Sequence, residues 1–115
     1  MAPTSHSKVV REVLDLTANG TTSINPGMAV QKVAITVTGN GGTPSAWDID
    51  VDGLPSPGSE ATAVEIDGHN SGAEALGATV NANVSGVVTG INVVLASLNL
   101  NGADALRVEL VMLGY

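Results

Sequence analysis

The sequence predicts an all-β domain, a single β-sandwich of the jelly-roll or Greek-key type with about seven or eight strands. Apolar and polar residues alternate along most segments, which is the period of a strand with one buried face. The 115-residue chain holds 14 glycines, and turn-forming pairs such as Asn19-Gly20 separate the alternating segments. This length is enough for one core, and the absence of cysteine excludes disulfides.

Residues 1–7 are small and polar, so they predict a short mobile N-terminal arm, and the sandwich is expected at residues 8–115. The first strand is expected at residues 8–18, read K-V-V-R-E-V-L-D-L-T-A. Some of its apolar residues also fit a helical period, which makes a helix the competing interpretation. The β-branched residues and the turn pair that follows favour a strand.

The clearest strand is expected at residues 46–53, where the sequence reads A-W-D-I-D-V-D-G. Three apolar side chains should be buried on one face and three carboxylates exposed on the other, because a slip of one residue would bury the acids. The two sets are Trp47, Ile49 and Val51 on the buried face and Asp48, Asp50 and Asp52 on the exposed face.

The remaining strands follow the same alternation between turns rich in Gly, Asn and Pro. They are expected at residues 21–24, 30–39, 62–67, 79–84, 87–100 and 105–115. Val64 and Ile66 should face inward, and a bulge is expected near Ala96-Ser97. Residues 73–78 contain helix-favouring residues but form too short a piece for a helix that stands alone.

Composition limits the classes of partner. The net charge is -7 and the chain has only four Lys and Arg residues, whereas nucleic-acid binding needs several clustered cations. The first residues lack the apolar core of a signal peptide, and no apolar run approaches the roughly 18 residues of a membrane span. The sequence therefore predicts a soluble, unprocessed polypeptide that binds neither nucleic acid nor membrane.

The segment D-I-D-V-D-G at residues 48–53 matches the first six positions of an EF-hand calcium loop. The twelfth position is Ser59 and not Glu, and two prolines intervene. A solvated strand face explains the spacing better, so we expect no metal and no cofactor. The alternative left open is a cation bound by the whole row of carboxylates.

Motifs for catalysis are missing from the sequence. His6 and His69 are too few for a zinc site in a chain without cysteine, and His69 is expected to be solvated in a glycine-rich turn at residues 68–72. Ser71 lies near it, but the G-x-S-x-G turn of a nucleophilic serine is absent. We therefore expect that the protein is not an enzyme.

Two features suggest a surface that binds other proteins. The first and last expected strands carry apolar residues on their nominally outer faces, and an open sandwich has edges that must be covered or paired. The candidate interface consists of Val9, Arg11, Val13, Val111, Leu113 and Tyr115. The alternative is that these strands are central and covered on both sides within the monomer.

The order of segments resembles small virion proteins of tailed bacteriophages, of the capsid decoration (cement) type. The resemblance rests on five segments: K-V-V-R-E-V-L-D-L-T-A, N-G-T-T-S-I-N-P-G, V-A-I-T-V-T-G, W-D-I-D-V-D-G and A-L-R-V-E-L-V-M-L-G-Y. The chain departs from that family after the acidic strand, where G-L-P-S-P-G-S replaces a hairpin of the S-x-D-G-x-x-W type.

The resemblance implies a protein made in the host cytoplasm that binds the outer surface of the major capsid protein lattice and stabilises the head, often as a homotrimer at three-fold positions. It implies no catalytic residue. The alternative is a host-recognition module of a tail fibre or adhesin that binds a glycan. Such a module would expose clustered aromatic residues, and the chain has only Trp47 and Tyr115.

Overall fold

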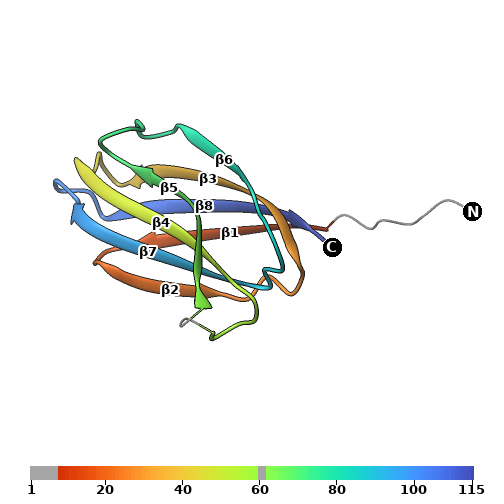
Figure 1. Cartoon of the computed structure of the whole chain (residues 1–115). Coiled ribbons are helices and arrows are strands. Elements are labelled where there is room, and N and C mark those ends of the chain that lie inside the picture. Colours follow the sequence, from red (N-terminus) through yellow and green to blue (C-terminus); the bar gives the residue numbers. More distant parts are fainter. Residues whose placement is uncertain (1–7, 60–61) are drawn as a thin grey trace, which may run out of the picture.

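The computed structural model of the chain describes residues 8–59 and 62–115, which form a sandwich of eight strands (Figure 1). The strands are β1 (Lys8–Leu16), β2 (Gly20–Ile24), β3 (Val30–Asn40), β4 (Ala46–Leu54), β5 (Val64–Asn70), β6 (Thr79–Asn83), β7 (Gly90–Asn99) and β8 (Ala105–Gly114). The part of the chain so described contains no helix able to cross a membrane. The arm expected at residues 1–7 lies outside it.

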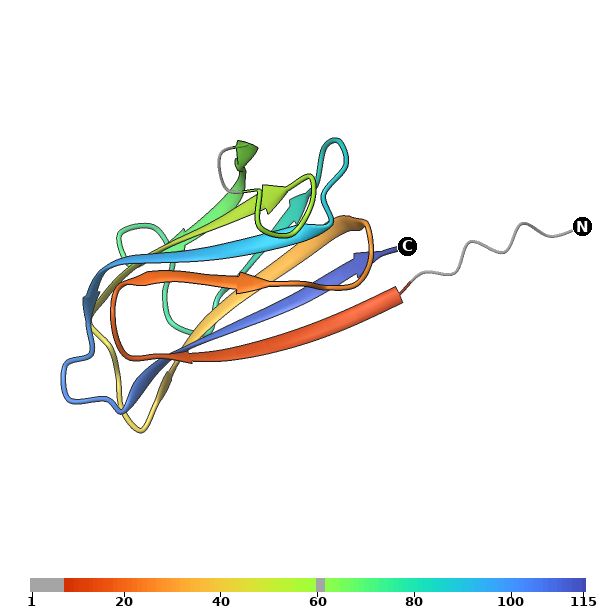
Figure 2. The same ribbon diagram turned by 90° about the horizontal axis from the view of Figure 1, so that it is seen from below.

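Two antiparallel four-stranded sheets pack face to face (Figures 1 and 2). Sheet A has the strand order β1-β8-β3-β6, and sheet B has the order β2-β7-β4-β5. Every connection except the one between β4 and β5 passes from one sheet to the other. This is the strand order of a jelly roll, so the predicted fold class is confirmed.

The core lies between the inner faces of the two sheets. Trp47, Ile49 and Val51 are buried in β4, as the alternation predicts. The first segment is a strand and not a helix, because β1 pairs with β8 along its whole length, from Lys8 opposite Gly114 onward. Opposite β4 and β7, the core is completed by alternate residues of β3 and β8: Val33, Ile35, Val37, Leu106, Val108, Leu110 and Met112.

The fifth strand begins and ends later than predicted. β5 covers Val64–Asn70 instead of residues 62–67, and its register with β4 shifts near its start. Val64, which we expected to face inward, is 68% exposed, whereas Ile66 is half-buried against the core. The sequence alternation did not reveal this irregularity, and Gly68, which suggested a turn, continues the strand.

The predicted bulge in β7 is present. Ala46 of β4 pairs with Asn99 of β7, and Asp48 pairs with Ala96, so β7 has one extra residue between these pairs. Ser97 lies in this bulge and has a positive φ of 55°. β7 begins at Gly90 and not at residue 87, so Val87 lies in the loop before it. Residues 73–78 form turns without a helix.

The prediction that His69 is solvated in a turn is wrong. His69 is fully buried in β5, where its Nδ1 accepts a hydrogen bond of 3.0 Å from Nε1 of Trp47. Its Nε2 lies 3.0 Å from the carbonyl oxygen of Ala78. Because Nδ1 is an acceptor, the ring proton is on Nε2, and this N–H donates a hydrogen bond to the carbonyl oxygen of Ala78. Ser71 also bonds Trp47, through its N–H and hydroxyl to the Trp47 carbonyl, so Ser71 holds the backbone of Trp47 while His69 holds its indole.

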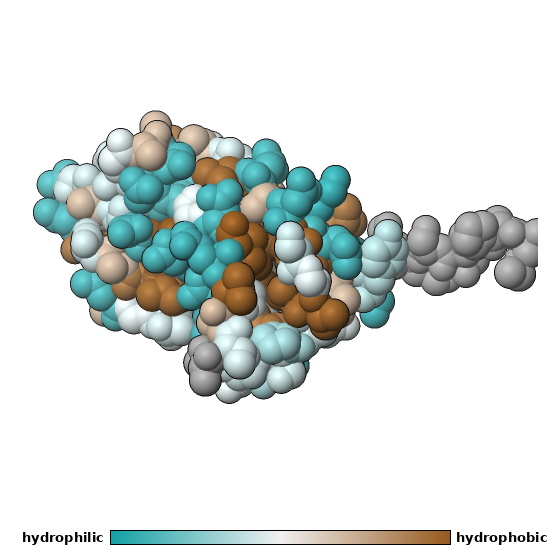
Figure 3. All heavy atoms as spheres, viewed as in Figure 1, coloured by the Kyte–Doolittle hydropathy of each residue, from teal (hydrophilic) through white to brown (hydrophobic). Residues whose placement is uncertain are grey.

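The aspartates of β4 lie on the outer face of sheet B but are less exposed than predicted. Asp48 is exposed, whereas Asp50 and Asp52 are half-buried, because β4 lies between β5 and β7. Burial, together with the charge of Asp50, raises the pKa of Asp52. Figure 3 shows this side of the molecule, where hydrophilic residues cover much of the surface.

Candidate protein-docking face

Sheet A brings the residues of the predicted interface together. β1 and β8 are neighbours, and Val9 lies opposite Leu113 while Arg11 lies opposite Val111. Val13 is the next outward residue of β1. These five side chains therefore form one continuous patch on the outer face of sheet A, which we call the docking face.

The sixth residue, Tyr115, follows directly after β8. Its backbone N–H and carbonyl both form hydrogen bonds with Ala29, at 3.0 and 2.9 Å. These bonds extend the pairing of β8 with β3 by one residue. Tyr115 itself is 57% exposed. The docking face thus ends in an anchored aromatic residue.

The apolar residues of this face remain accessible. Val9 is 67% and Val13 41% exposed, while Val111 and Leu113 are half-buried. No described segment lies over the outer face of sheet A, since the molecule has only two layers (Figure 2). The alternative that both strands are central and covered is therefore wrong: β8 is central, β1 is an edge strand, and both are open on the outside.

Two shallow hollows adjoin Leu113. One, of about 380 Å³, is lined by outward residues of β8, β3 and β6, which include Val111, Ala34 and Asn81. The other, of about 280 Å³, lies toward Tyr115. The sequence did not predict the contribution of β3 and β6, because it does not reveal that β8 pairs with β3 and β3 with β6.

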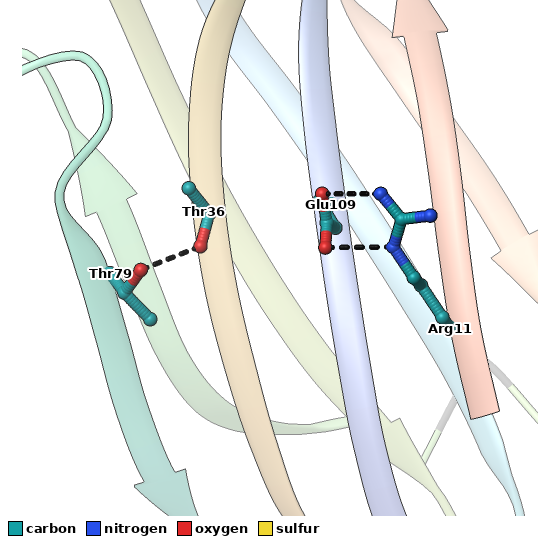
Figure 4. Close-up of polar contacts among 4 residues, drawn as sticks. All are labelled: Arg11, Thr36, Thr79 and Glu109. Atoms are coloured by element: carbon teal, nitrogen blue, oxygen red, sulfur yellow. Dashed lines mark hydrogen bonds and ion pairs between the residues drawn. The ribbon is translucent and has the colours of Figure 1, made fainter. Parts of the chain in front are cut away.

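Two ion pairs cross from β1 to β8 on the same face. Arg11 donates two hydrogen bonds to the carboxylate of Glu109, at 2.8 and 3.0 Å (Figure 4). Arg107 donates two to Asp15, at 2.9 and 3.1 Å. These hydrogen bonds from arginine lower the pKa of both carboxyl groups. Bidentate pairing orients each guanidinium group toward the carboxylate on the neighbouring strand.

Charge is divided between the two sheets. The strands of sheet A carry all four Lys and Arg residues of the chain. The strands of sheet B carry none of them but hold five carboxylates: Asp48, Asp50, Asp52, Glu65 and Asp67. An acidic protein thus presents one face with more cations than carboxylates, because Lys32, opposite Leu113, adds a third cation to the two of the ion pairs. This division depends on strand order and was not predicted.

The described residues also contain a smaller apolar patch that the sequence did not predict. Val64 at the start of β5 and Val87 in the β6–β7 loop are 68% and 72% exposed. A shallow hollow between these segments is lined by Ile66, Val84 and Val88. Apolar residues gather there on the lower part of the face in Figure 3.

Metal binding by the row of aspartates finds no support in the described geometry. Within residues 8–59 and 62–115, no three His, Asp or Glu side chains are grouped closely enough to hold a metal ion. His69 is committed to Trp47 and Ala78. The predicted site residues that come together are thus those of the docking face.

We expect Asp52→Asn to stabilise the protein at neutral pH. The pKa of Asp52 is higher in the folded than in the unfolded chain, so folding becomes less favourable as the pH rises through that range. Asparagine has no charge to bury beside Asp50, so the free energy of unfolding at pH 7 should rise by about 1 kcal/mol or less. Urea denaturation at pH 7 and about pH 3 measures the effect.

The gain should disappear at the lower pH, where the aspartate is protonated in both states. Asp48→Asn is the matched control, since Asp48 is exposed on the same strand, and it should change stability less. An equal gain at both pH values would show that the charge of Asp52 is not the cause.

Comparison with known proteins finds no matching family model, no similar curated protein and no similar solved structure. The function must therefore be inferred from the geometry of the docking face, together with the resemblance of the segments to phage decoration proteins.

Proposed function

We propose that the protein is a virion structural protein of a tailed bacteriophage, a decoration protein that binds the outer surface of the major capsid protein lattice and stabilises the head. The observation that carries this proposal is the convergence of Val9, Val13, Val111 and Leu113, from opposite ends of the chain, on one uncovered face. A jelly roll is also used by viral capsid domains and by lectins, so the fold alone supports either class.

The composition of the docking face suits binding to a protein surface. Its centre is apolar, and its margin holds Arg11 and Tyr115, residue types that often dominate interface energetics. Arg11 keeps three N–H donors beyond the two bound to Glu109. The hollows on either side of Leu113 can accept side chains of the partner.

The division of charge supports an orientation on the capsid. Sheet A would face the lattice, and the acidic sheet B would face solvent, where its carboxylates oppose nonspecific association. Self-association would multiply these contacts on a repeating lattice.

The glycan-binding alternative is less well supported. Trp47 is buried and bonded to His69, so it cannot form a sugar platform, which leaves Tyr115 as the remaining aromatic ring. Nothing else in the described residues resembles an aromatic-lined sugar site.

Binding to heads tests the proposal. Heads assembled from a genome that lacks this gene should bind the purified protein in a saturable manner and become more resistant to heat. Sedimentation of heads with bound protein and the melting of the heads provide the two measurements. Protein that never sediments with heads, or that instead binds a glycan array tightly, would contradict it.

A further inference from the structure

We propose that two copies of this chain pair through the open edge of β1, antiparallel and around a two-fold axis at Val13, so that their A sheets form one eight-stranded sheet. This goes beyond the proposed function and does not depend on it.

The open edge of β1 differs from the other three sheet edges of the described fold. Natural proteins protect edges by keeping them short, by bulges and by proline. β2 and β6 have five residues each, and the register of β5 with β4 is irregular. β1 has nine residues, no Gly or Pro, and an unbroken one-to-one register with β8. Figure 2 shows it along one margin of the sandwich, open to the outside.

Both sides of β1 carry apolar residues that remain partly accessible. On the outer side Val9 and Val13 are exposed. On the inner side Val10, Leu14 and Leu16 contact the core but are only half-buried. A further strand at this edge would cover part of each set, and the main-chain groups of β1 that point away from β8 would gain partners.

Geometry and charge together select the register. Opposed residues in an antiparallel pair point to the same face of the sheet. The two-fold axis must therefore pass midway between the two copies of one residue, which face each other. An axis at Arg11 or Glu12 would place like charges opposite each other, which is unfavourable. An axis at Val10 or Leu14 would pair only residues 8–12 or 12–16 of β1, whereas an axis at Val13 pairs residues 10–16. An axis at Val13 pairs the two valines and places Arg11 of one copy opposite Asp15 of the other. It also places Val10 opposite Leu16 on the inner side.

This pairing would join two docking faces. The outer faces of the two A sheets would become continuous, because paired strands extend the same sheet. A dimer would then present two copies of the patch side by side, and a repeating partner could bind both at once. The two-fold pair also differs from the homotrimer that the resemblance implies, so the mass in solution distinguishes them.

The first test is the mass of the wild-type protein by sedimentation or light scattering over a range of concentrations. Pairing predicts twice the chain mass of 11.5 kDa at high concentration. A monomer at all concentrations, or a trimer, would overturn the pairing. A monomer that still binds heads would leave the proposed function intact.

Disulfide cross-linking tests the register, since the chain has no cysteine of its own. In the proposed dimer the two copies of residue 13 face each other, at a Cα separation that a disulfide can span. Val13→Cys should therefore form covalent dimers under mild oxidation. Val9→Cys is the control: the two copies of residue 9 would lie about 26 Å apart, although Val9 is more exposed than Val13.

Selective cross-linking of the Val13→Cys protein supports the pairing. Equal cross-linking of both variants would indicate random collision and overturn it, as would the absence of cross-linking in both. Circular dichroism checks that each variant keeps its fold.

Discussion

Replacing His69 by alanine is expected to destabilise the protein by about 3 kcal/mol or more. The variant would lose a fully buried ring and leave a cavity. It would also leave the buried Nε1–H of Trp47 and the half-buried carbonyl of Ala78 without their partner. Urea denaturation followed by circular dichroism measures the loss, and the emission of Trp47 should shift toward that of a solvated indole.

His69→Phe separates packing from hydrogen bonding. Phenylalanine fills much of the space but offers no acceptor to Trp47, so this variant should recover only part of the stability. If alanine costs less than about 1 kcal/mol, or if phenylalanine restores full stability, the hydrogen bonds of His69 do not contribute as described.

The double substitution Val111→Gln and Leu113→Gln is expected to weaken binding to heads by about 100-fold or more. Both residues lie at the centre of the docking face, and Leu113 lines both of its hollows. Burial of two apolar side chains favours binding, whereas burial of two amide groups without hydrogen-bond partners opposes it. Glutamine adds no charge, so the ion pairs of Arg11 and Arg107 remain as they are. Titration of heads with purified protein gives the change in affinity.

Val94→Gln is the matched control. Val94 is a half-buried valine that faces outward from β7, on the opposite sheet. Its substitution should leave binding to heads unchanged. Equal losses in the control and the double variant, or normal binding by the double variant, would show that sheet A does not carry the binding surface.

The sequence predicted the parts of the fold that depend on local alternation. The period of two around Trp47 correctly placed three apolar residues in the core. In β1 that pattern was ambiguous, and the β-branched residues with the turn pair that follows correctly favoured a strand over a helix. A backbone irregularity breaks this pattern, and there the prediction failed: Val64 is exposed. Glycine at position 68 suggested a turn, yet an extended strand accommodates glycine as well.

Features that depend on contacts between distant segments could not be predicted. The burial of His69 follows from its position opposite Ile49 in β4, next to an indole that needs an acceptor. The docking face was predicted only in part, because its apolar residues are visible in β1 and β8 but the pairing of β8 with β3 is not. The division of charge between the sheets has the same origin.

A density map of purified virions tests the central claim most directly. The proposal predicts density for the sandwich on the outer surface of the head, with β1 and β8 against the capsid protein and the aspartates of β4 toward solvent. A map in which the head carries no such density, or in which sheet B contacts the lattice and sheet A faces solvent, would contradict it.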